Sequence, residues 1–269
     1  MRCSLLIALM LQGLLLCACG PRTETTVGKG SASTTLSHRA FDEILRRQVD
    51  SQGLVDYVSL QKDDRVLLDA YLNSIAATDP ASLATREDRL AYWLNAYNAF
   101  VIAGVLDRYP MESVQKVEGF FKEKRYLAGG KTYSLDEIEN EIIRPTFEEP
   151  RIHFILVCAA KSCPRLGNRA MDPSSLEKTL EESARGFINS ANGVRVNEID
   201  KKLEVSALFK WYRKDFEQEA GSVIDYLLRY LNEPPPDIGD YEITFLSYDW
   251  ALNEQAQPVP ANGQQQTED

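Results

Sequence analysis

The chain has 269 residues, a formal net charge of −10 and 44% hydrophobic residues. Its acidity argues against non-specific binding to nucleic acid or to anionic lipid headgroups, because these partners attract basic surfaces. The length allows one large domain with a substantial core between polar end segments.

The first residues have the pattern of an export signal. The apolar run from Leu5 to Leu16 is shorter than the roughly 20 residues of a membrane-spanning helix, and Arg2 is the only charge before it. Leu16-Cys17-Ala18-Cys19 resembles the lipobox of bacterial lipoproteins. We therefore expect residues 1–18 to be removed and Cys19 to carry lipid. An ordinary secretory signal, with both cysteines incidental, is the alternative.

Polar segments flank the predicted domain. Residues 19–38 are rich in Ser, Thr and Gly and predict a flexible tether, with Gly20 rather than an Asp after the cysteine. This favours a periplasm-facing place at the outer membrane of the cell envelope, with the lipid as the membrane contact. Residues 254–269 predict a disordered tail. One globular domain is expected over residues 39–253.

Helices and strands are intermixed in the expected order of elements. Helices are predicted over residues 41–49, 66–75, 87–109, 134–144, 174–190, 208–216 and 222–231, and strands over residues 55–58, 125–127, 131–133, 151–158, 194–196, 203–205 and 241–246. Capping boxes are expected at Ser134 with Glu137 and at Ser174 with Glu177, and Pro145 is expected to end the helix that Ser134 begins. The glycine pair at 129–130 predicts a hairpin turn.

The longest helix is predicted to be central and buried. No charge occurs from Leu90 to Leu106, so this helix has no solvent face, and a membrane span is the competing interpretation. The fold class expected is α+β, a single domain with this helix packed on a mixed or antiparallel sheet.

Two asparagines of this helix are candidate site residues. Asn95 and Asn98 are three residues apart and therefore share one face. A buried amide needs hydrogen-bond partners. The two amides either brace a neighbouring segment or position a catalytic side chain or a substrate carbonyl.

A histidine and two cysteines form the second candidate cluster. On a strand over residues 151–158, His153 and Cys158 would point to opposite faces, whereas Cys163 lies in the loop beyond it. Cys163 is therefore the better partner for the imidazole. Four states stay open for the cysteines in an oxidising compartment: a Cys158–Cys163 disulfide, inert thiols, a reactive Cys163, or metal ligation.

These segments resemble the bacterial and plant proteins grouped as domain of unknown function 547. The matching segments are Ala91–Ala99, Ser134–Glu139, Arg151–Phe154, Cys158–Pro164, Phe209–Tyr212 and Tyr248–Trp250 with Asn253. The resemblance implies a single α+β domain that is often carried by exported or lipid-anchored bacterial proteins. In one departure, Asn140 stands where members commonly carry a histidine after Ile-Glu. This puts in doubt any activity that depends on that histidine.

Two functions are expected from these residues. In the first, a thiol-dependent amide hydrolase or acyltransferase uses Cys163 as nucleophile, His153 as base, and Asn95 or Asn98 to orient the imidazole or hold the oxyanion. In the second, a non-enzymatic envelope module with a structural disulfide binds a protein or glycan partner. No phosphate-binding glycine loop, G-x-S-x-G or H-E-x-x-H motif occurs, and no cofactor is expected.

Overall fold

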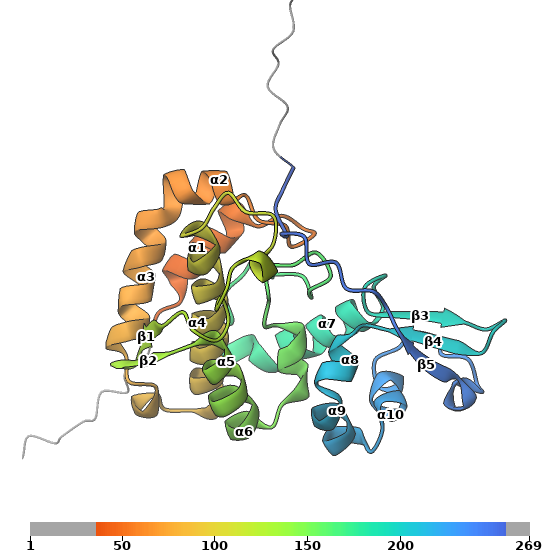
Figure 1. Ribbon diagram of the computed structural model, residues 1–269. Helices are drawn as coiled ribbons and strands as arrows, with labels where there is room; N and C mark the ends of the chain where they lie inside the picture. The colour runs from red at the N-terminus through yellow and green to blue at the C-terminus, as the bar shows by residue number, and fades with distance from the viewer. Residues whose placement is uncertain (1–35, 257–269) are drawn as a thin grey trace, which may run out of the picture. The chain divides into compact units, whose positions relative to one another are not determined.

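The computed structural model describes residues 36–256, which form an α+β domain (Figure 1). The helices are α1 (Arg39–Gln48), α2 (Tyr57–Ser59), α3 (Arg65–Ala77), α4 (Arg86–Leu106), α5 (Leu135–Glu137), α6 (Arg144–Phe147), α7 (Leu176–Ile188), α8 (Leu208–Trp211), α9 (Arg213–Ala220) and α10 (Val223–Leu228). Segment η1 (Leu60–Asp64) and segment η4 (Ile138–Ile143) are π-helical, and η5 (Pro150–Phe154) is a 3-10 helix. The strands are β1 (Tyr126–Ala128), β2 (Lys131–Tyr133), β3 (Val194–Asn197), β4 (Lys202–Val205) and β5 (Glu242–Phe245). The expected fold class is confirmed.

Helix α4 is central, as predicted. Thr85 and Asp88 form a reciprocal capping box at its start, and every residue from Leu90 to Leu106 is buried. Phe100 stacks on Tyr126 of the β1–β2 hairpin, so the helix packs on an antiparallel pair of strands. Among residues 36–256, no helix has the length and hydropathy needed to cross a membrane.

The β3–β4–β5 sheet belongs to a second hydrophobic cluster. β3 pairs antiparallel with β4, and β4 pairs parallel with β5. Leu203 and Val205 of β4 are buried together with Phe154 of η5, Phe209 of α8 and apolar side chains of α7, α9 and α10. Figure 1 shows this sheet on the opposite side of the domain from α3.

The predicted strand over residues 151–158 is wrong. Pro150 is compatible with a first helical turn, and the Glu149 side chain accepts a hydrogen bond from the Arg151 N–H, so a 3-10 helix forms instead. The chain then continues through the buried residues Ile155 and Val157, whose backbone groups bond to the side chain of Asn98 rather than to another strand.

Other local predictions also failed for identifiable reasons. Pro145 does not end a helix, because it lies in the first turn of α6, where its missing N–H is tolerated. Glu177 forms no capping box, since it pairs with Arg151. The expected strand over residues 55–58 is reduced to isolated bridges at Val55, and α2 begins two residues later.

Both ends of the described chain are in contact with the domain. His38 Nδ1 lies 2.7 Å from the hydroxyl of Tyr71, and Gln255 Nε2 donates to the carbonyl groups of Gln48 and Leu54. The predicted signal peptide (1–18), the lipidation site Cys19, most of the tether and residues 257–269 of the predicted tail lie outside the described residues.

Candidate functional site

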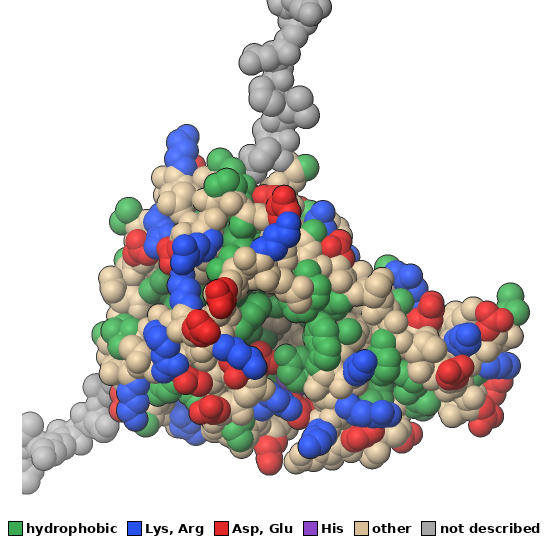
Figure 2. Space-filling model, in the orientation of Figure 1, with side chains coloured by type: hydrophobic (Ala, Val, Ile, Leu, Met, Phe, Trp, Pro, Cys, Tyr) green, Lys and Arg blue, Asp and Glu red, His purple; other side chains and the backbone are tan. Residues whose placement is uncertain are grey.

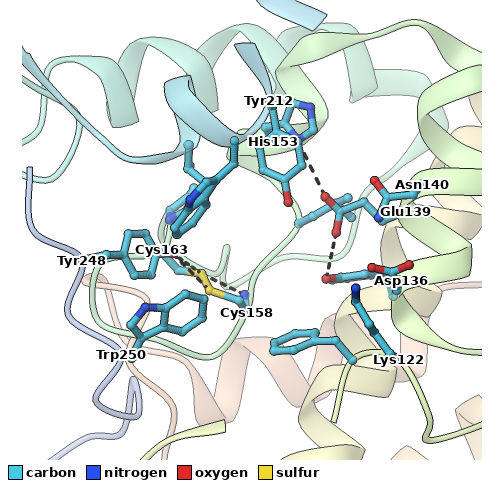
Figure 3. Close-up of a pocket in the computed structure, with 16 residues that line it drawn as sticks. Lys122, Asp136, Glu139, Asn140, His153, Cys158, Cys163, Tyr212, Tyr248 and Trp250 are labelled. Atoms are coloured by element: carbon cyan, nitrogen blue, oxygen red, sulfur yellow. Dashed lines mark hydrogen bonds and ion pairs between the residues drawn. A yellow bond between two sulfur atoms is a disulfide. The ribbon is translucent and has the colours of Figure 1, made fainter. Parts of the chain in front are cut away.

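A pocket of about 280 Å³ lies between the α5–η4 helix, the loop after η5, and α8. Figure 2 shows a recess on this face with hydrophobic side chains along its border. The pocket is lined by Tyr97, Phe121, Lys122, Asp136, Glu139, Asn140, His153, Leu156, Cys158, Cys163, Pro164, Leu208, Trp211, Tyr212, Tyr248 and Trp250 (Figure 3). It therefore brings together His153 and both candidate cysteines with residues from distant parts of the chain.

One wall of the pocket is aromatic. The ring of Trp211 lies 4.9 Å from that of Tyr248 and 5.8 Å from that of Trp250, measured between centroids. Trp211 ends α8, whereas Tyr248 and Trp250 follow β5 in the C-terminal segment. The sequence contains these aromatic residues, but only the fold places them in one wall.

The disulfide Cys158–Cys163 forms the adjoining part of the wall. The Tyr248 hydroxyl lies 3.1 Å from the sulfur of Cys158 and 3.3 Å from that of Cys163. Within the loop, the Lys161 and Ser162 N–H groups donate to carbonyl groups of residues 251 and 249. The loop therefore fastens the segment that carries Tyr248 to the rest of the domain.

His153 is buried opposite the disulfide and is held by Asp215. Its Nε2 lies 2.8 Å from Oδ2 of Asp215, and its ring stacks on Tyr212 at 3.7 Å between centroids. Arg144 donates to both carboxylate oxygens of Asp215 at 2.7 Å. Partial burial opposes ionisation of Asp215, but hydrogen bonds from His153 and Arg144 outweigh it and hold the pKa of this carboxyl well below its usual range.

Glu139 lies on the other side of the imidazole. Its Oε1 is 4.0 Å from His153 Nδ1, and its Oε2 accepts a hydrogen bond from the Tyr97 hydroxyl at 3.2 Å. The Glu139 side chain is only 10% exposed. Burial, reinforced by the Glu139 charge, raises the pKa of Tyr97 well above its usual value.

Sequence reasoning missed both acidic partners of the histidine. Asp215 is 62 residues from His153, and nothing in its local sequence distinguishes it from other surface carboxylates. Glu139 lies in the Ser134–Glu139 segment of the family resemblance, and its local sequence does not mark it as a partner of the histidine. Asn140, which stands where the resemblance led us to expect a histidine, borders the pocket, and its Oδ1 accepts a hydrogen bond from Arg144 at 2.6 Å.

The predicted roles of Asn95 and Asn98 in orienting the imidazole do not agree with the structure. Asn95 donates to the carbonyl of Met171 and accepts from its N–H, and Asn98 makes the same pair of bonds to Ile155 and Val157. Each side-chain amide therefore satisfies a backbone N–H and a backbone carbonyl of a buried segment, as a neighbouring strand would. Asp215, not an asparagine, holds the imidazole.

The arrangement around His153 can support ligand binding or proton transfer. No group of three or more His, Cys, Asp and Glu side chains within residues 36–256 is arranged to hold a metal ion. With Nε2 directed at Asp215, the other ring nitrogen of His153 is directed toward Glu139 and the pocket.

The comparisons with known proteins concern part of this domain. A family model matches residues 80–188, which include α4, the Ser134 capping box, His153 and the disulfide loop. No curated protein and no solved structure matches the chain. The match supports the expected resemblance. Over residues 80–188, the chain is similar to the family described as protein of unknown function, DUF547.

Proposed function

We propose that this chain is a lipid-anchored protein of the bacterial envelope whose folded domain binds a ligand in the pocket beside His153. The observation that carries this proposal is the Cys158–Cys163 disulfide, which joins the two cysteines of the described chain within the pocket wall. Neither sulfur is a nucleophile in this state. A structural disulfide also agrees with the oxidising compartment that the export signal predicts.

The pocket has the composition of a small-ligand site. An aromatic wall, in which Trp211 is exposed, lies opposite buried polar groups that are held by Asp215 and Tyr97. Ligand sites commonly combine an apolar surface with a few precisely held polar groups. A small molecule or one residue of an envelope glycan or protein fits this description.

The state of the thiols tests the binding proposal. Intact-mass analysis of the mature protein after alkylation should show no modified side-chain thiol without reductant and two after reduction and denaturation. Two alkylated thiols in the untreated protein would contradict a structural disulfide and favour the thiol chemistry described next.

A thiol-dependent amide hydrolase or acyltransferase is the second candidate function. It is favoured by one observation: Cys163 and the Asp215-held His153 line the same pocket. After reduction by a dithiol, Cys163 would form a thioester with the acyl group, and the amine would leave with a proton. In reduced protein, Cys163→Ser should abolish labelling by an iodoacetamide probe at neutral pH, whereas Cys158→Ser should retain it. Equal labelling of both variants would exclude this candidate.

The anchor has its own test. When the full precursor is expressed in a bacterium supplied with labelled palmitate, Cys19→Ala should lose the label and Cys17→Ala should keep it. Retained label in the Cys19 variant would contradict lipidation at this residue.

A further inference from the structure

The hydrogen-bond partners of His153 determine which of its nitrogens carries a proton. Asp215 is an ionised carboxylate that accepts from Arg144 at both oxygens, so it has no proton to donate. Nε2 of His153, 2.8 Å from Oδ2, must therefore be the donor. In the neutral imidazole, the lone pair is then on Nδ1.

Nδ1 of His153 faces the carboxylate of Glu139. Oε1 of Glu139 lies 4.0 Å from Nδ1, which is beyond hydrogen-bond distance. The other oxygen of Glu139 accepts from Tyr97, and Tyr212 also hydrogen-bonds this carboxylate. Two neighbouring acceptors that border one cavity leave a position for a hydrogen-bond donor between them.

The cations of the domain do not fill this position. Arg144 is engaged with Asp215 and Asn140, and Lys122 is an exposed residue at the border of the pocket. The buried charge that faces the cavity is therefore the carboxylate of Glu139. Arg144, which also interacts electrostatically with Glu139, is hydrogen-bonded to Asp215 and Asn140, so a positively charged ligand group in the cavity would complement this buried carboxylate.

We propose that the pocket recognises a primary ammonium group attached to a flat or apolar body. The ammonium donates to Glu139 Oε1 and His153 Nδ1, and the body lies against Trp211 and the neighbouring rings. An ammonium has three donors, which suits two adjacent acceptors, and aromatic faces also attract cations. A volume of about 280 Å³ limits the ligand to a small molecule or to one residue of a larger one. This inference rests on the proposed function, since it assumes that the pocket binds a ligand.

Tryptophan fluorescence of the mature protein provides the assay. Trp211 and Trp250 line the pocket, whereas Trp93 is buried in α4. Two matched pairs of probes differ only in the ammonium: phenethylamine with 2-phenylethanol, and glucosamine with glucose. We expect the amine of at least one pair to bind about tenfold more tightly than its hydroxyl counterpart, the size of a hydrogen bond to a charged group. The pair with the tighter amine identifies the body as aromatic or as a sugar.

Two variants locate the effect. Glu139→Gln removes the charge and should abolish the preference for the amine. Glu141→Gln removes an exposed charge from the same π-helical segment and should leave the preference within about twofold, because an exposed charge is screened by solvent. Thermal unfolding midpoints show whether each variant is folded, and the comparison of amine with hydroxyl in the wild-type protein does not depend on any variant.

The outcomes separate the two proposals. Equal binding of amine and hydroxyl in both pairs would overturn the ammonium inference while ligand binding in the pocket stands. An amine preference that survives in Glu139→Gln would also overturn it. If no probe changes the fluorescence at millimolar concentration, the ammonium inference fails together with small-ligand binding at this site.

Discussion

Removing the Cys158–Cys163 disulfide should destabilise the domain by an amount that the loop length determines. The double variant Cys158→Ala/Cys163→Ala is the appropriate change, because either single variant leaves a free thiol. The bond joins residues five apart in sequence. Chain entropy for a closed loop of this size amounts to about 7 cal/mol/K, or about 2 kcal/mol at 25 °C.

Local contacts add to this value. The Cys158 N–H donates to the sulfur of Cys163, and the Tyr248 hydroxyl lies within hydrogen-bond distance of both sulfurs. Each lost hydrogen bond costs about 0.5–1.5 kcal/mol. We therefore expect a total loss of about 3–5 kcal/mol in the free energy of unfolding.

Urea unfolding of the mature protein measures this loss. Reductant should lower the stability of the wild-type protein toward that of the double variant, and it should not affect the double variant. Equal free energies of unfolding for oxidised wild-type protein and double variant would refute the reasoning, because the crosslink would then restrict nothing in the unfolded chain.

The remaining predictions concern the packing at Gly104, the backbone hydrogen bonds of Asn95 and the pH dependence of stability. Gly104→Ala places a Cβ 2.6 Å from the Tyr126 hydroxyl and should lower the free energy of urea unfolding by about 1–3 kcal/mol. The control Gly186→Ala lies in α7, where the added Cβ meets no atom within 4 Å, and should raise this free energy by about 0.5–1 kcal/mol. Destabilisation of equal size in both variants would exclude the packing explanation. Asn95→Ala should cost about 1–3 kcal/mol for each of the two Met171 backbone groups it leaves unsatisfied, with the fluorescence response to pocket ligands unchanged; an altered response would assign the amide to the site. Burial lowers the pKa of His38 to about 4 from 6.5, so the unfolded chain takes up the proton at a higher pH than the folded protein does. The contribution of neutral His38 to the free energy of unfolding is therefore complete above pH 6.5 and is lost as pH falls toward 4, by up to about 3 kcal/mol. His38→Gln should lack this component between pH 7 and pH 4, and an unchanged pH profile would contradict it.

Local sequence signals determined several elements. The capping box at Ser134 and the glycine pair between β1 and β2 act within a few residues, so their structures follow from the sequence. The uncharged stretch from Leu90 to Leu106 predicted the central helix, because a helix without a polar face must be enclosed by the domain. The apolar run after Arg151 predicted a strand wrongly, because burial on all sides does not distinguish a strand from a short buried helix such as the 3-10 helix Pro150–Phe154.

The candidate site depended on tertiary structure. The sequence identified His153, Cys158 and Cys163 as chemically notable, and it left the disulfide as one of several states. It could not show that Asp215 and Glu139 flank the imidazole, since these residues come from separate helices. Nor could it choose between bracing and catalysis for Asn95 and Asn98. Hydrogen-bond partners far apart in sequence are chosen only when packing brings their segments together, and for these residues packing made that choice.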